Sequence, residues 1–66
     1  MTVGRYGSTP VGVGRKLSVG DREFLEVKDG PFFALYERLE DGSFRRIGEF
    51  RRSYEAHRRA FEEAAR

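Results

Sequence analysis

Phe32–Ala65 reads FFALYERLEDGSFRRIGEFRRSYEAHRRAFEEAA, and this stretch decides the fold of the chain. Two aromatic-rich runs, Phe32–Leu39 and Phe44–Arg51, flank the dipeptide Asp41-Gly42, which is the strongest short-range signal of a β-hairpin. Ser53 fits a helix N-cap, and the alanine-rich and charged residues after it favour a helix to the end of the stretch. The stretch therefore predicts a hairpin that leads directly into one amphipathic helix.

The residues before this stretch predict further strands. Arg22–Lys28 is rich in strand formers, and Asp29-Gly30-Pro31 separates it from the hairpin. Val11–Val19 is a candidate edge strand, joined to the next one by a turn at Gly20-Asp21. We therefore expect an α+β fold in which three or four antiparallel strands precede one C-terminal helix packed on one face of the sheet.

The chain has 66 residues, which is enough for one domain. It has no cysteine, so no disulfide can stabilise that domain. Residues 1–10 are polar and contain Gly4 and Gly7, and glycine loses much conformational entropy on ordering. We expect residues 1–10 to form a flexible, glycine-rich basic arm and residues 11–66 to form a single domain.

The expected pairing gives the hairpin two different faces. A two-residue turn at Asp41-Gly42 pairs Leu39 with Phe44, Glu37 with Arg46, Leu35 with Gly48 and Phe33 with Phe50. These residues would form an apolar face under the helix, with Glu37 and Arg46 as an ion pair within it. The other face would carry Tyr36 and Arg38, with Arg38 opposite Arg45, and two like charges so placed favour a bound anion.

Two further choices complete this arrangement. A three-residue loop, Asp29–Pro31, places Leu25 and Val27 on the apolar face, whereas a two-residue loop at Asp29-Gly30 places them on the arginine face. We prefer the first loop because it extends the apolar face. The helix residues expected to cover that face are Tyr54, His57, Phe61 and Ala64, flanked by Ala60 and Ala65.

The net charge of +2 conceals a segregated distribution of charge. Residues 21–44 contain three bases and seven acids, whereas residues 45–59 contain six arginines and two glutamates. The arginines either contact the phosphates of a nucleic acid or form a solvated surface paired with nearby glutamates. Tyr36 and Phe32 either form a platform on which bases stack or lie half-buried against a neighbouring strand.

The candidate nucleic-acid-binding residues are Tyr36, Arg38, Arg45, Arg51, Arg52, Arg15 and Lys16.

No catalytic signature is present, and we expect no enzymatic activity, no cofactor and no metal. His57 is the only histidine and has no cysteine partner. Gly12–Lys16 lacks both the third glycine of a dinucleotide-binding loop and the ending of a phosphate-binding loop. No apolar run approaches the ~20 residues that span a membrane, and we expect a cytoplasmic location.

The joint between the last strand and the helix resembles that of a known family. Phe50, Glu55 and Ala56 follow a basic strand and an Asp-Gly hairpin, as in the AP2 and integrase arm-binding DNA-binding domains. The resemblance covers roughly Phe24–Ala65. It implies a three-stranded sheet with one face in the major groove of DNA and the helix packed behind, so that Tyr36, Arg38, Arg45 and Arg51 would face the DNA.

These observations favour a non-enzymatic module that binds nucleic acid through the exposed sheet face. Duplex DNA is the expected ligand, and the N-terminal arm is expected to make a second contact. The alternative is a protein-interaction module, such as a phage-type inhibitor or an accessory subunit. Such a module would dock on an acidic protein surface or occupy a nucleic-acid channel. A homodimer that pairs the edge strand Val11–Val19 is a third possibility.

Overall fold

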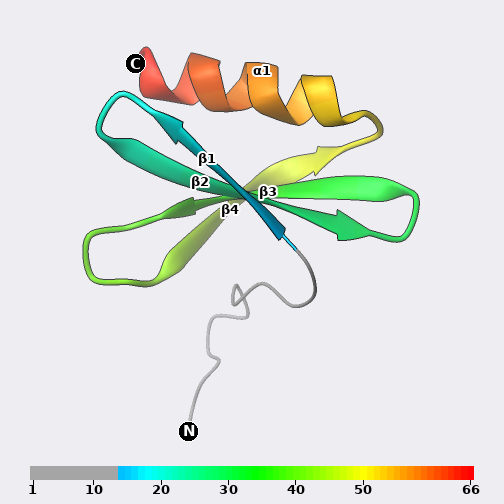
Figure 1. The fold of residues 1–66 in the computed structure, drawn as a ribbon, viewed down its shortest axis with the longest axis horizontal. Coiled ribbons are helices and arrows are strands. Elements are labelled where there is room, and N and C mark those ends of the chain that lie inside the picture. The colour runs from blue at the N-terminus through cyan, green and yellow to red at the C-terminus, as the bar shows by residue number, and fades with distance from the viewer. Residues whose placement is uncertain (1–13) are drawn as a thin grey trace, which may run out of the picture.

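The computed structural model describes residues 14–66 and shows a four-stranded antiparallel sheet followed by one helix (Figure 1). Its elements are β1 (Gly14–Val19), β2 (Arg22–Asp29), β3 (Phe32–Arg38), β4 (Phe44–Phe50) and α1 (Ser53–Ala64). The strands lie side by side in chain order, and α1 packs along one face of the twisted sheet. The expected α+β fold is confirmed. The expected arm, residues 1–10, lies outside the described residues.

The β3–β4 hairpin has a longer loop than the two-residue turn expected from Asp41-Gly42. The Leu39 N–H donates to the Ser43 carbonyl at 2.8 Å, and the Gly42 N–H donates to the Leu39 carbonyl at 3.0 Å. Gly42 has a φ of 89°, which a residue with a side chain rarely adopts. A turn followed by one left-handed glycine makes a three-residue loop, so the expected pair of Leu39 with Phe44 is wrong and Arg38 pairs with Phe44 instead.

A β-bulge corrects this offset halfway along the hairpin. The register shifts between Leu35 and Tyr36, where Ile47 is the extra residue of β4. Beyond the bulge, Leu35 pairs with Gly48 as expected, and so does Phe33 with Phe50.

Between the loop and the bulge, every residue of β4 lies on the face opposite to the one expected. A shift of one residue reverses all side chains of a strand. Arg45 therefore lies opposite Glu37 on the helix side, and Arg46 lies opposite Tyr36 on the other side. The expected pairs of Arg38 with Arg45 and of Glu37 with Arg46 are both wrong.

The β2–β3 turn also differs from the preferred three-residue loop. Asp29 pairs with Phe32, so that only Gly30 and Pro31 form the turn. Leu25 and Val27 consequently lie opposite Tyr36 and Ala34, on the face away from the helix. Gly30 has a φ of 61°, and this conformation permits so tight a connection. The turn at Gly20-Asp21 is confirmed.

The helix packs on the sheet through alanines. Phe24 and Leu35 are buried beneath Ala56 and Ala60, because small helix residues leave room for large side chains from the sheet. The helix therefore faces the sheet with a different side from the one expected. Tyr54 and Phe61, which were expected to cover the sheet, are 62% and 56% exposed. The residues packed around this core are Leu17, Val19, Ile47, Phe50 and Ala64.

Ser53 does not cap the helix, contrary to expectation. Arg52 occupies the N-cap position, and its backbone N–H donates to the Glu55 carboxylate at 3.1 Å. The Ser53 hydroxyl instead donates to Glu26 on β2 at 2.6 Å. Across residues 14–66, no helix has the length and apolar character needed to cross a membrane.

Candidate nucleic-acid interface

Arg45 is bound by carboxylates on the helix side of the sheet. Its Nη2 donates to Glu37 Oε1 at 2.8 Å and to Glu63 Oε1 at 3.3 Å. Arg22 donates two hydrogen bonds to the same Glu37, from Nε to Oε2 at 2.7 Å and from Nη2 to Oε1 at 2.9 Å. Arg59 donates to the other oxygen of Glu63 at 3.1 Å. Arg45 is therefore part of a network that ties α1 to three strands, rather than a member of an exposed cationic face.

The network keeps Glu37 ionised. Hydrogen bonds from Arg22, and then from Arg45, lower the pKa of Glu37 to about 2, although its burial acts in the opposite direction. Hydrogen bonds from Arg45 and Arg59 likewise hold the pKa of Glu63 below its ordinary value. The two carboxylates offset two of the three positive charges of Arg22, Arg45 and Arg59, so the network as a whole keeps a single positive charge.

Tyr36 is buried, with 9% of its surface exposed, which contradicts its expected role in an exposed platform. Its ring lies edge-to-face with Phe44 at 6.4 Å between centroids, and the Arg46 guanidinium lies 5.9 Å from its centroid. Leu25 is its neighbour on β2. Packed in this way, Tyr36 supports its neighbours and offers no free ring face to a base.

Arg38 and Lys16 lie on the same sheet face as Tyr36 but on different strands. Arg38 is the last residue of β3, and within residues 14–66 it forms one ion pair, with Glu23 at 3.5 Å, where both side chains are about half exposed. Lys16 lies on the edge strand β1, opposite Leu25. Both line one hollow. Arg38 is at the opposite end of the sheet from Arg51, which follows β4, and Lys16 lies between the two ends.

The other predicted residues lie on the half of the sheet where α1 begins. In an antiparallel sheet, the first residues of β1 and β3 lie beside the last residues of β2 and β4. Arg15 lies opposite Glu26, and Lys28 lies opposite Phe33, which in turn pairs with Phe50. We call the four cations at this end the basic end: Arg15, Lys28, Arg51 and Arg52.

Aromatic rings support two of these cations. The Arg51 guanidinium carbon lies 5.6 Å from the centroid of Phe32, and Lys28 Nζ lies 5.5 Å from that of Phe33. Such contacts orient a cation without neutralising it. Arg15, Lys28 and Phe33 also line a hollow of about 310 Å³ on the helix side. Asp29 is the exposed carboxylate that shares this end.

Glu26 lines this hollow, and its carboxylate is already hydrogen-bonded within the protein. It accepts from the Ser53 hydroxyl at 2.6 Å and lies 3.1 Å from His57 Nε2. The Ser53 hydroxyl also lies 3.5 Å from His57 Nε2. The three residues tie the first turn of α1 to β2. Among the described residues, no group of three His, Cys, Asp or Glu side chains is placed to hold a metal ion.

Lys28 is the member of the basic end that the sequence analysis did not single out. Its position in the sequence could have identified it, because Lys28 lies just before the β2–β3 turn and Arg51 lies just after β4. In an antiparallel meander these two points lie at the same end. Comparison with known protein families, with curated proteins and with solved structures found no match. The resemblance to the AP2 and integrase arm-binding domains therefore stays a prediction.

Proposed function

We propose that this chain is a non-enzymatic module that binds the phosphate backbone of nucleic acid through its basic end. One observation carries the proposal: Arg15, Lys28, Arg51 and Arg52 are all exposed, and none of them takes part in an ion pair within residues 14–66. Arg22, Arg45 and Arg59, in contrast, are held by Glu37 and Glu63. Free guanidinium and ammonium groups are the ones that can replace the counterions of a phosphate backbone.

The size of the basic end suits this role. Its cations come from the edge strand β1, from β2, and from the two residues that follow the other edge strand, β4. Strands are about 4.8 Å apart, so three spacings give a width of about 14 Å. That width is comparable to the major groove of DNA, at about 12 Å, and it reaches several phosphates of one strand. In this proposal the N-terminal arm and the sheet face supply second contacts.

The salt dependence of binding tests this function. Four phosphate contacts predict that log K falls with log[salt] with a slope of about −3.6 on duplex DNA and about −2.8 on a single strand. On a duplex, affinity should therefore fall about 100-fold between 50 and 200 mM salt. Fluorescence anisotropy with a labelled 20-mer measures both values. Absence of binding at low salt, or a slope near zero, would contradict the proposal.

A matched pair of double variants locates the contact. Lys28→Gln with Arg51→Gln removes two charges from the basic end and should halve the slope. Arg58→Gln with Arg66→Gln removes two exposed charges, one from α1 and one from beyond its C-terminal end, and should leave the slope nearly unchanged. If both pairs lower the slope equally, binding depends on net charge alone, and the assignment to the basic end is wrong.

A second candidate, a protein-interaction module, is favoured by one specific observation. Tyr54 and Phe61 lie seven residues apart on the outer side of α1, with Arg58 between them, and both aromatic side chains are more than half exposed. Exposed aromatic residues next to an arginine are typical of the centre of a protein interface. A partner retained from nuclease-treated lysate, and lost with Tyr54→Ser and Phe61→Ser together, would support this candidate over the first.

A further inference from the structure

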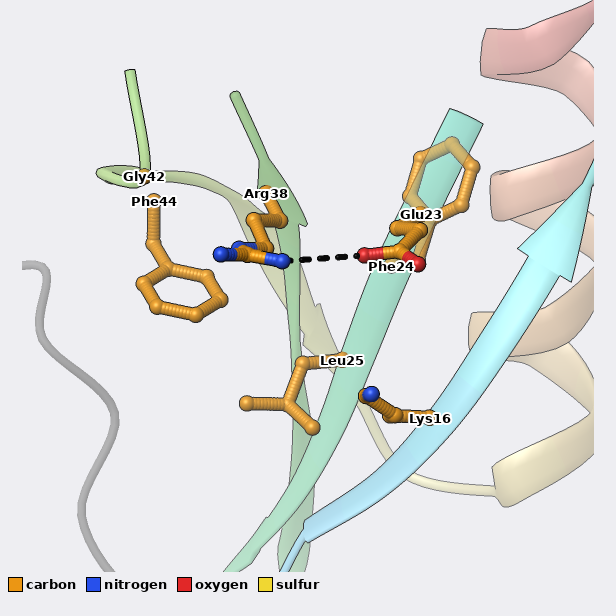
Figure 2. A pocket seen from close by; sticks show the side chains of 7 residues that line it. All are labelled: Lys16, Glu23, Phe24, Leu25, Arg38, Gly42 and Phe44. Atoms are coloured by element: carbon orange, nitrogen blue, oxygen red, sulfur yellow. Dashed lines mark hydrogen bonds and ion pairs between the residues drawn. The ribbon is translucent and has the colours of Figure 1, made fainter. Parts of the chain in front are cut away.

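A second hollow, of about 350 Å³, lies on the sheet face away from the helix (Figure 2). Leu25 and Phe44 point into the same space, and Lys16 and Arg38 stand beside it. Its remaining lining residues are Glu23, Phe24 and Gly42. The hollow therefore combines an apolar interior with two cations contributed by different strands.

The Phe44 ring has a fixed position. Tyr36 lies edge-to-face against it, 6.4 Å between centroids and with an angle of 84° between the ring planes. Edge-to-face contact uses the edge of one ring and leaves other ring surface free. Phe44 is half-buried, so part of it faces the hollow. The stacking surface that the sequence analysis assigned to Tyr36 is provided, in the structure, by the ring next to it.

The cations beside the hollow are available to an anion. Lys16 is exposed and takes part in no ion pair within residues 14–66. Figure 2 shows the Arg38 guanidinium between the Phe44 ring and the Glu23 carboxylate. The Arg38–Glu23 contact is long, at 3.5 Å, and half exposed, and pairs of this kind contribute little and exchange readily.

We propose that this hollow receives one unpaired nucleobase, which stacks on Phe44 while Lys16 and Arg38 contact the phosphates on either side of it. The inference rests on the proposed function and deepens it, because it makes single-stranded nucleic acid the preferred ligand. A base within a duplex has both faces covered by its neighbours and cannot enter the hollow. Aromatic stacking combined with flanking cations is how single strands are held without regard to sequence.

The test compares single strands with a duplex in the wild-type protein and in two variants. Phe44→Leu keeps an apolar side chain over Tyr36 but removes the aromatic face, and Phe61→Leu makes the same change on the exposed side of α1. Anisotropy with dT12, rU12 and a 12-bp duplex should show a loss of about tenfold for the single strands with Phe44→Leu. Duplex binding by Phe44→Leu, and all binding by Phe61→Leu, should stay within about twofold of wild type. The dT12 and rU12 arms distinguish DNA from RNA as the source of the base.

Two outcomes separate this inference from the function on which it rests. If Phe44→Leu binds single strands as tightly as wild type while Lys28→Gln with Arg51→Gln weakens them, the base site is wrong and backbone binding stands. If no strand binds at 50 mM salt, both proposals fail. Shifts of the Leu25 methyl and Phe44 ring signals on addition of dT4 to the wild type, without shifts at Phe61, would support the site directly.

Discussion

The two ends of the sheet present opposite charge to solvent. At the basic end, the side chains of Arg15, Lys28, Arg51 and Arg52 form no ion pair with a carboxylate among the described residues. The other end, which we call the acidic end, holds the β1–β2 turn with Asp21 and the β3–β4 loop with Glu40 and Asp41, all exposed (Figure 1). Arg22 and Arg45 lie closer to the acidic end, and both are bound to Glu37.

The comparison shows that strand register, rather than the number of arginines, decides which charges a partner can reach. Arg45 and Arg51 are six positions apart on the same stretch of chain. The register places Arg45 opposite Glu37, whereas Arg51 follows the last paired residue of β4 and lies over the ring of Phe32. Arg45 is held in the network of the fold, whereas the Arg51 side chain forms no ion pair within residues 14–66.

The largest expected effect is on stability, and it separates the arginines that are held from those that are free. Glu37→Gln removes the charge that binds Arg22 and Arg45, and should lower the free energy of unfolding by about 2–3 kcal/mol. The loss is below that of a fully buried pair because the two arginine side chains are 30% and 47% exposed. Arg51→Gln should cost less than about 1 kcal/mol. Urea denaturation measures both, and equal losses would remove the distinction between the two ends.

Acid should weaken the same network. The pKa of Glu37 is about 2 in the folded chain, against an ordinary value of about 4.5. A lowered pKa contributes stability that is complete above the unfolded value and is lost as the pH falls from about 4.5 towards 2. The pKa of Glu63 is lowered too, by Arg45 and Arg59, and adds to the loss. Thermal unfolding from pH 7 to pH 2 should show this decline, and the decline should be shallower in Glu37→Gln.

A smaller loss of stability is expected at the basic end. Glu26 is buried and binds Ser53 and His57 at the start of α1. Glu26→Gln weakens both hydrogen bonds and should lower the free energy of unfolding by about 1–2 kcal/mol. Ser53→Ala removes only one of them and serves as the matched comparison. If Glu26→Gln unfolds at the same urea concentration as wild type, these bonds do not hold the helix to β2.

The smallest effect is on affinity and concerns the acidic end alone. Asp21→Asn with Glu40→Gln removes two exposed carboxylates that repel phosphate, and should raise affinity about twofold at 20 mM salt. The gain should disappear near 150 mM salt, where the screening length is about 8 Å. Anisotropy at the two salt concentrations checks this. A gain that persists at high salt would indicate that Asp21 or Glu40 itself contacts the ligand.

The strands, their order and the terminal helix could be predicted from the sequence, because turn residues and local propensities specify them. The register could not. Asp41-Gly42 marks a turn, but the same dipeptide suits a two-residue turn and a longer loop with glycine in a left-handed conformation. The extra residue of β4, Ile47, carries no local signal. These two offsets cancel beyond Leu35, so the pairs far from the loop were right and those near it were wrong.

The candidate site was affected by the same uncertainty. Three of its seven residues, Arg15, Arg51 and Arg52, lie towards the same end of the sheet, which strand order alone determines. Arg45 and Tyr36 were misplaced because their faces depend on the register. The side of the helix that packs on the sheet was predicted wrongly because the large apolar rings of Tyr54 and Phe61 were expected to be buried. Close packing over Phe24 and Leu35 instead requires small residues such as Ala56 and Ala60.

The bulge at Ile47 has a further consequence, for growth of the sheet. β4 is one of its two outer strands, and a bulge bends such a strand and interrupts its row of free backbone groups. β1 pairs with β2 at six consecutive positions without a shift. A further chain that extends this sheet would therefore be expected to join along β1, so that such assembly stops at a pair of molecules and does not continue into a fibre.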